Sequence, residues 1–219
     1  MIKALLWDMD GVLLDSEPLH DVVLSKVLAH YGKECTDEDR IRFMGTTSIK
    51  MWATFKEEYD MDAPLEELVN MQWEYLIKML PDSGIPASSG LKDVLKYAKE
   101  NNIACAIVSS SRRDFIKTVL NYLDVTEYFD YIVDGFKVEK GKPAPDIYNL
   151  AMETGGFKPE ECLIIEDSTN GVGAAVNAGV KCIGYDNPTS EGQDISPANY
   201  IVKNLGEIVD ILKTDFISK

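Results

Sequence analysis

Short apolar runs alternate with helical periodicity along most of the chain, after a first apolar run at residues 2–7. The later runs have the length of strands and occupy residues 103–108, 131–133, 163–165 and 180–184. Helical patterns separate them near residues 90–101, 112–122, 144–154 and 169–178. Continuous apolar runs joined by helices are typical of strands covered on both faces. The pattern therefore predicts an α/β fold with a Rossmann-like parallel sheet and helices on both of its faces.

Residues 15–84 interrupt this alternation, because their pattern is helical throughout. Helical stretches lie near 47–59 and 65–80, and turn-forming residues from Pro81 to Gly84 end the segment. We therefore predict an α/β core made of residues 1–14 and 85–219, with an all-helical domain of residues 15–84 inserted into it.

The charge of the chain excludes some classes of partner. Its 219 residues include 22 Lys and Arg against 37 Asp and Glu, a formal net charge of −15. This balance argues against nucleic acids and anionic membranes, because both require a basic protein surface. A small anionic substrate needs only a few local cations and is compatible with the composition.

The sequence also gives expectations about the cellular compartment. No apolar stretch approaches the ~20 residues that span a bilayer, and the first residues lack the apolar region of a signal peptide. The four cysteines show no CxxC spacing, which favours reduced thiols over disulfides or a metal site. We expect a cytoplasmic protein that does not contact a membrane.

Polar residues follow directly after several predicted strands, and open α/β sheets bind their ligands at these carboxyl ends. The candidates are Asp8 and Asp10 after the first strand, Ser109 and Ser110 after the second, Lys142 in the loop after the third, and Glu166 and Asp167 after the fourth. The sequence therefore predicts that carboxylates, hydroxyls and a lysine converge on one edge of the sheet.

The two carboxylate pairs would repel each other strongly at that edge. Unit charges ~4 Å apart interact by roughly 4 kcal/mol at an effective dielectric constant of 20. A hard divalent cation compensates such repulsion, and ligand sets made of oxygen favour Mg²⁺. Asp8 alone would be better explained as a solvated loop residue or a helix cap. The second pair at another strand end makes a magnesium site the stronger interpretation.

Two other candidates have an ordinary structural alternative. Ser109 could hold an oxyanion at a helix N-terminus, but taken alone it is better explained as the cap of the helix that begins near Arg112. Lys142 precedes Pro143 at the predicted start of the next helix, where a lysine is usually a solvated surface residue. Its surroundings do not form a Walker A motif, because five residues instead of four separate Gly135 from Gly141 and Pro143 replaces Ser or Thr.

Taken together, the ordered motifs resemble those of the haloacid dehalogenase superfamily. They are residues 8–12 (Asp-Met-Asp-Gly-Val), Ser109 after an apolar strand, Lys142-Pro143, and residues 166–168 (Glu-Asp-Ser). The helical insertion after the first motif resembles the C1-capped subgroup, which contains small phosphatases and β-phosphoglucomutase. The resemblance spans nearly the whole chain.

The resemblance implies a role for each acidic residue. Asp8 would be the nucleophile that forms an aspartyl-phosphate, and Asp10 would act as general acid and then as general base. Asp8, the backbone carbonyl of Asp10, Glu166 and Asp167 would bind Mg²⁺.

The resemblance also implies a set of phosphate-binding residues. Ser109, the amide of Ser110 and Lys142 would hold the transferred phosphoryl group. Gly11, inside the first motif, is a further candidate for substrate binding, as is Arg113. Arg113 follows the serine loop after Arg112 and could give the site a positive potential, although an arginine on a helix surface is the ordinary alternative.

The substrate class follows in part from Asp10. Dehalogenases of this superfamily lack an acid two residues after the nucleophile, because a halide leaves without a proton. Asp10 therefore points to a phosphate ester or anhydride as the substrate.

A mutase would need a cap arginine for a second phosphate, and the corresponding stretch, residues 44–50, contains none. His20 and Lys78 do resemble mutase cap positions, although an exposed helical histidine and a solvated lysine are the ordinary alternatives.

The leading hypothesis is a Mg²⁺-dependent phosphatase of small phosphorylated metabolites, with sugar phosphates as the expected substrates. A β-phosphoglucomutase-type isomerase is the second hypothesis, and a non-catalytic protein that binds a phosphorylated ligand is the third. We expect no nucleic acid partner, and the oligomeric state stays open with a monomer favoured.

Overall fold

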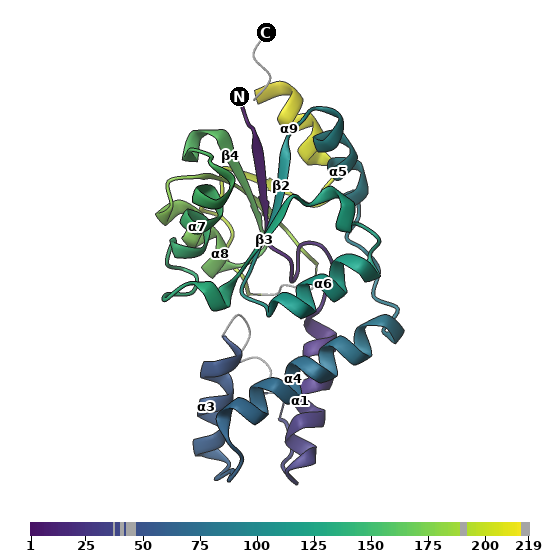
Figure 1. Ribbon diagram of the computed structural model, residues 1–219, viewed down its shortest axis with the longest axis vertical. Coiled ribbons are helices and arrows are strands. Elements are labelled where there is room, and N and C mark those ends of the chain that lie inside the picture. The colour runs from purple at the N-terminus through teal and green to yellow at the C-terminus, as the bar shows by residue number, and fades with distance from the viewer. Residues whose placement is uncertain (37, 40–41, 43–46, 189–191, 216–219) are drawn as a thin grey trace. The chain divides into compact units, whose positions relative to one another are not determined.

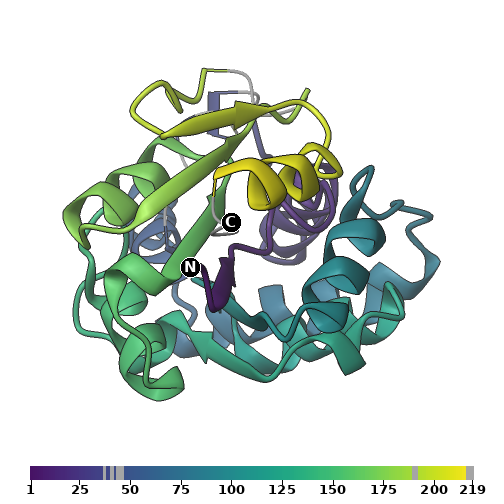
Figure 2. The same ribbon diagram turned by 90° about the horizontal axis from the view of Figure 1, so that it is seen from above.

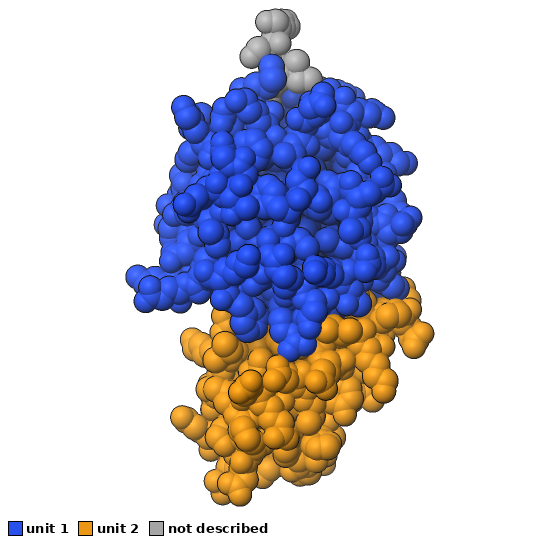
Figure 3. Space-filling view, in the orientation of Figure 1, with its two compact units in different colours: residues 1–15, 85–219 blue, residues 16–84 orange. Residues whose placement is uncertain are grey.

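The computed structural model describes residues 1–36, 38–39, 42, 47–188 and 192–215. The chain divides into two compact units, which we call unit 1 (residues 1–15 and 85–219) and unit 2 (residues 16–84) (Figure 3). The interpretation of these units as a catalytic core and a cap domain stays a prediction, and each unit is described below by itself.

Unit 1 is built on a sheet of six parallel strands with the order β3-β2-β1-β4-β5-β6 (Figure 1). The strands are β1 Ala4–Trp7, β2 Ala104–Ser109, β3 Tyr131–Asp134, β4 Cys162–Glu166, β5 Lys181–Tyr185 and β6 Tyr200–Val202. This sheet confirms the predicted fold class, and β1 lies near its centre because the chain returns to both sides of it.

Helices cover both faces of this sheet (Figure 2). The helices are α5 Leu91–Glu100, α6 Arg113–Tyr122, α7 Asp146–Gly155, α8 Thr169–Asn177 and α9 Glu207–Asp215. Helices α7 and α8 lie on one face, and α5, α6 and α9 lie on the other. Since strand order reverses direction after β3, right-handed crossovers place the helices on opposite faces in this way.

The apolar runs in the sequence are explained by burial on both sides of the sheet. Ala4 and Leu6 of β1 belong to the core cluster that includes Ile147 and Ala151 of α7. Leu5 and Trp7 alternate with them along the strand and are also fully buried. Because successive side chains point to opposite faces, a strand covered twice has no polar position within it.

Unit 2 contains the helices α1 Glu17–His30, α3 Ser48–Glu58 and α4 Leu65–Met79, followed by the short 3₁₀ helix η1 Leu80–Asp82. Helix α4 contacts both α1 and α3. The interior of unit 2 holds Trp52, Phe55, Leu68 and Leu76, all fully buried. The indole N–H of Trp52 donates a hydrogen bond of 2.8 Å to Oε1 of the buried Gln72, which ties α3 to α4.

One predicted boundary is wrong. The sequence pattern places the start of a helix at Pro143, whereas α7 begins at Asp146 and the residues before it form a turn. Ala144 precedes Pro145, and a residue before proline is disfavoured in the helical conformation.

Among the described residues, no helix combines the length and the apolar character needed to cross a lipid bilayer.

Candidate active site at the carboxyl edge of the sheet

The carboxyl ends of the central strands bring the predicted acidic residues together. Trp7 of β1 is in register with Ile107 of β2 and with Ile165 of β4. The backbone N–H of Asp8 donates to the carbonyl of Ile165 at 3.0 Å, so the chain after β1 stays beside the end of β4. Glu166 therefore follows at the same edge as Asp8.

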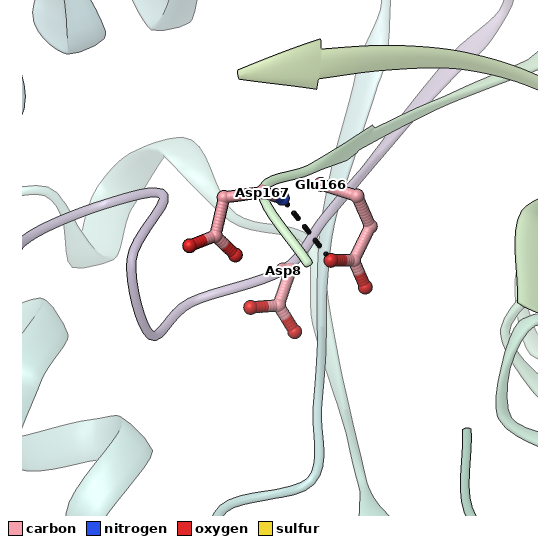
Figure 4. Close-up of side chains that lie close together, drawn as sticks. All are labelled: Asp8, Glu166 and Asp167. Atoms are coloured by element: carbon pink, nitrogen blue, oxygen red, sulfur yellow. Dashed lines mark hydrogen bonds between the residues drawn. The ribbon is translucent and has the colours of Figure 1, made fainter. Parts of the chain in front are cut away.

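Three carboxylates form a tight group there. Asp8, Glu166 and Asp167 each offer an oxygen, and these atoms all lie within 4.8 Å of one another (Figure 4). All three residues are buried. The predicted convergence of Asp8 with the second acidic pair is thus present in the structure, whereas the side chain of Asp10 is not a member of this group.

Lys142 supplies a positive charge to the acidic group. Its Nζ lies 2.5 Å from Oδ1 of Asp8 and 2.6 Å from Oε1 of Glu166, and its side chain is 8% exposed. Burial alone would lower the pKa of Lys142, but the charges of Asp8 and Glu166 outweigh burial and raise it. Lys142 is therefore a buried, charged residue and not the solvated lysine of the alternative interpretation.

At Asp8, burial and the neighbouring carboxylates outweigh Lys142 in their effect on the pKa. Burial raises the pKa of the Asp8 carboxyl well above its usual range. Lys142 opposes that shift, while the charges of Glu166, Asp167 and Asp10 add to it. A single lysine thus does not compensate the negative charge gathered at this edge.

Glu166 is surrounded by hydrogen-bond donors. Its Oε1 accepts from Lys142 Nζ at 2.6 Å and from Tyr148 Oη at 2.7 Å. Its Oε2 accepts from the backbone N–H of Asp167 and from Ser168 Oγ, both at 3.2 Å. Tyr148 was missed by sequence reasoning, because a tyrosine on an amphipathic helix has the pattern of an ordinary core residue.

Two glycines leave room for these carboxylates. Gly11 has a φ of +77°, and a Cβ at this position would lie 1.9 Å from Oδ2 of Asp167. A Cβ on Gly171 of α8 would lie 1.9 Å from the Glu166 carboxyl carbon. The N–H of Gly11 donates to Leu14 O at 3.0 Å. The structure therefore explains Gly11 by close packing of the loop, and its predicted role in phosphate binding stays untested.

The serine loop after β2 contacts the second aspartate. Ser111 Oγ donates a hydrogen bond of 2.6 Å to Oδ2 of Asp10, and Ser109 Oγ accepts from the Ser111 N–H at 3.1 Å. Ser109 does not cap the following helix, because Arg112 occupies that position. The backbone of Ser110 packs against Gly135, where a Cβ would lie 2.9 Å from Ser110 Cα.

Arg113 is engaged elsewhere in unit 1. Its Nε lies 2.8 Å from Oδ2 of Asp134, and its Nη2 donates to the carbonyl of Ile132 at 2.6 Å. These contacts tie the start of α6 to β3. The predicted role of Arg113 in substrate binding stays a prediction.

The predicted substrate-binding residue His20 belongs to unit 2, as does Lys78, which resembles a mutase cap position. His20 lies on α1 with its ring edge-on to Trp73, at 6.5 Å between ring centroids. Lys78 lies in the last turn of α4. Of the stretch 44–50, residues 44–46 lie outside the described residues. Roles for these positions in substrate binding stay predictions.

The carboxylate group fits a hard divalent cation. Its ligand atoms are all oxygens, and the negative charge exceeds what Lys142 neutralises. The glycine at position 11 keeps the space beside Asp167 free of a side chain. Asp8 and Asp167 are the residues best placed to bind such an ion, with Glu166 next to them.

Comparison with known proteins places this geometry in context. A family model described as haloacid dehalogenase-like hydrolase matches residues 5–185. The chain is 30% identical over 214 residues to the phosphorylated carbohydrates phosphatase of Thermotoga maritima, covering 97% of this chain and 99% of that protein. It is 31% identical over 180 residues to the fructose-1-phosphate phosphatase YqaB of Escherichia coli, covering 82% and 94% of the two chains. The solved structure of CbbY from Rhodobacter sphaeroides in complex with phosphate is similar with a TM-score of 0.89 at 26% identity, covering 95% of this chain and 96% of that one.

Proposed function

The chain belongs to the haloacid dehalogenase-like hydrolase family, and on that premise we propose that it is a magnesium-dependent phosphatase of small phosphorylated metabolites. The reaction would pass through an aspartyl-phosphate on Asp8. The observation that carries the proposal is the buried Asp8 carboxylate, with Lys142 Nζ at 2.5 Å and two further carboxylates beside it. This arrangement offers a nucleophile and a cation in one buried place.

Asp8 is the residue that attacks phosphorus. One of its carboxylate oxygens forms a bond to the phosphoryl group as the bond to the ester oxygen breaks. The attack brings together two anions, so Lys142 must neutralise charge on the phosphoryl oxygens while it stays within reach of Asp8. Its ion pair with Asp8 already holds the ammonium group at that position.

Bound Mg²⁺ would neutralise the phosphoryl oxygens and lower their repulsion from the nucleophile. Asp8 and Asp167, with the backbone carbonyl of Asp10 and with Glu166 next to them, would hold it. Ser109, the amide of Ser110 and Lys142 position the phosphoryl group for transfer.

Asp10 moves the protons of the reaction. It donates a proton to the leaving oxygen and then accepts one from the water that hydrolyses the aspartyl-phosphate. Ser111 Oγ donates to its Oδ2 at 2.6 Å, which fixes the Asp10 carboxyl group beside the serine loop. Ser109 and the amide of Ser110 are proposed to bind the phosphoryl oxygens at the end of β2.

Sugar phosphates are the proposed substrates. Two relatives with at least 30% identity support this class, because one is named for phosphorylated carbohydrates and the other for fructose 1-phosphate. The strongly acidic composition agrees with a small anionic substrate that is recognised by a few local cations. His20 of unit 2 is also proposed to take part in substrate binding.

The test replaces the nucleophile and keeps its shape. Asp8→Asn should abolish the release of phosphate from p-nitrophenyl phosphate and the trapping of a phosphoenzyme, in the presence of Mg²⁺. Asp186→Asn is the matched control, because Asp186 is an exposed acid that also follows a strand. Unchanged turnover in Asp8→Asn would refute the proposal.

A second assay separates hydrolysis from group transfer. The wild-type protein is incubated with sugar phosphates, nucleoside monophosphates and β-glucose 1-phosphate with a bisphosphate activator. Free phosphate from sugar phosphates supports the proposed phosphatase. Glucose 6-phosphate formed faster than free phosphate would instead identify the mutase reaction.

A further inference from the structure

A buried tyrosine contacts both members of an ion pair in the proposed active site. Tyr148 of α7 is fully buried, and its Oη donates a hydrogen bond of 2.7 Å to Oε1 of Glu166. The same oxygen accepts from Lys142 Nζ at 2.6 Å. That ammonium nitrogen also lies 5.1 Å from the centroid of the Tyr148 ring. One side chain therefore touches the carboxylate through its hydroxyl and the lysine through its ring.

The hydroxyl completes the environment of Glu166. Its Oε2 is held by the N–H of Asp167 and by Ser168 Oγ, so both carboxylate oxygens accept two hydrogen bonds each. A carboxylate saturated in this way is fixed in position and its charge is spread over several donors. Lys142 is then shared between Glu166 and Asp8 instead of being drawn fully to one of them.

We propose that Tyr148 is a positioning residue for the phosphatase reaction: through Glu166, its hydroxyl sets where the Lys142 ammonium lies between Glu166 and the nucleophile Asp8. This inference rests on the proposed function. Without the hydroxyl, Oε1 of Glu166 would have Lys142 as its remaining donor, and the ammonium group would be held more tightly away from the phosphoryl group.

The test compares the hydroxyl of Tyr148 on α7 with that of Tyr131 on β3, whose hydroxyl donates to the backbone of α7. Tyr148→Phe removes the donor to Glu166 and keeps the ring beside Lys142. Tyr131→Phe is the matched control, because Tyr131 Oη donates a hydrogen bond of 2.8 Å to the backbone carbonyl of Ala151 in α7. Tyr131 also lies at the end of β3 that is opposite to the site. Each variant loses one buried or half-buried hydrogen bond, and the two differ in whether the acceptor is Glu166.

We expect kcat for p-nitrophenyl phosphate to fall about tenfold in Tyr148→Phe with little change in KM, since hydrogen bonds to charged groups are the stronger ones. Tyr131→Phe should stay within about twofold of the wild type in both constants, because its hydroxyl acts on backbone alone. The inference would be overturned if both variants kept the kcat of the wild type, or if both lost kcat by the same factor. A merely structural role would lower the thermal midpoint of both variants without separating their kcat values.

Repeating Tyr148→Phe in the variant Glu166→Gln shows whether the hydroxyl acts through Glu166. In Glu166→Gln the charge that Tyr148 satisfies is absent, so adding Tyr148→Phe should change the single-turnover rate by less than about twofold. This comparison also covers the case in which Tyr148→Phe alone fails to fold, because the unsatisfied buried charge is gone. A tenfold loss in the Glu166→Gln background would contradict the route through Glu166.

The two proposals fail in different ways. If the wild-type protein releases no phosphate from any substrate, the proposed function is wrong. If the wild type is active and Tyr148→Phe matches it in kcat and KM, the phosphatase stands and only the positioning role of Tyr148 is lost.

Discussion

The ion pairs of Lys142 in unit 1 and of Arg42 in unit 2 have similar short contacts and different surroundings. Lys142 Nζ lies 2.5 Å from Asp8 and 2.6 Å from Glu166, and Arg42 Nη2 lies 2.5 Å from Glu58. The Lys142 and Glu166 side chains are 8% and 0% exposed, whereas those of Arg42 and Glu58 are 40% and 44% exposed. The same distance therefore corresponds to a desolvated charge in one unit and to a hydrated one in the other.

This difference separates stability from function. Burying a charged pair removes hydration that the pairing only partly replaces, so such a pair is weak evidence for stability. A surface pair keeps its hydration and contributes little. Unit 2 draws its stability from an apolar interior, while unit 1 keeps buried charge at one edge of its sheet. Buried charged groups with shifted pKa values are therefore candidates for a site with chemistry.

Removing the buried cation should have the largest effect. Lys142→Met leaves Asp8 and Glu166 without their shared partner, and breaking a buried pair in this way costs about 4 kcal/mol of unfolding free energy. Urea unfolding with circular dichroism measures the loss. Lys140→Met is the control, because Lys140 is exposed two residues earlier in the same loop. A loss equal to that of the control would mean that the pair is not desolvated.

The interior of unit 2 should respond nearly as strongly. Leu68 of α4 is fully buried, and Leu68→Ala removes buried methyl groups and leaves a cavity, which costs about 3 kcal/mol. Two of the three tryptophans of the chain, Trp52 and Trp73, lie in this unit, so fluorescence follows its unfolding in urea. Ile49→Ala, at a half-exposed position of α3, should leave the transition in place. Equal midpoints would contradict an apolar origin of stability in unit 2.

Removing one negative charge from the acidic group should increase stability. Burial and the neighbouring acids raise the pKa of Asp8, so the folded state binds its proton more tightly than the unfolded chain does. The contribution of Asp8 to stability therefore becomes more favourable as the pH falls from neutral toward the ordinary aspartate value of about 4. In Asp8→Asn this slope is reduced, and at pH 7 with a chelator present the variant is more stable by about 1 kcal/mol.

The check for Asp8→Asn is urea unfolding at pH 7 and pH 5. The gain over wild type should shrink at pH 5, because protonation then relieves the wild type as well. Asp186→Asn, which removes an exposed charge, should show no such difference between the two pH values. If Asp8→Asn is less stable than the wild type at pH 7, the attraction between Lys142 and Asp8 exceeds the repulsion within the acidic group.

Much of unit 1 could be predicted from the sequence for a physical reason. Strands covered on both faces contain apolar residues at every position, so β1, β2, β4 and β5 stand out as continuous runs. Parallel strands end at one edge, which is why Asp8 and Glu166 could be expected to meet there. The helices of unit 2 were equally visible from their periodicity.

The contacts that complete the site could not be predicted. The hydrogen bond from Ser111 to Asp10 joins residues that are 101 positions apart. The ion pair of Arg113 with Asp134 could not be expected, because it depends on how α6 packs beside β3. Tyr148 could not be identified from the sequence, since a tyrosine that binds a carboxylate has the same helical pattern as an ordinary core aromatic residue. Such pairings are decided by tertiary packing and not by spacing along the chain.

The surface ion pair of unit 2 should give the smallest effect, and it tests the comparison directly. Glu58→Gln removes the charge that accepts two hydrogen bonds from Arg42, one from Nη1 at 3.0 Å and one from Nη2 at 2.5 Å. Despite this close geometry, the urea midpoint of unit 2 should not change measurably, because water replaces the lost partner at an exposed position. Arg42→Met is the less direct variant, because Arg42 Nη2 also lies 3.4 Å from Oδ1 of the buried Asp39. A loss approaching that of Lys142→Met would mean that distance, and not burial, decides what an ion pair contributes in this chain. The difference between the two units would then no longer identify the acidic edge as a functional site.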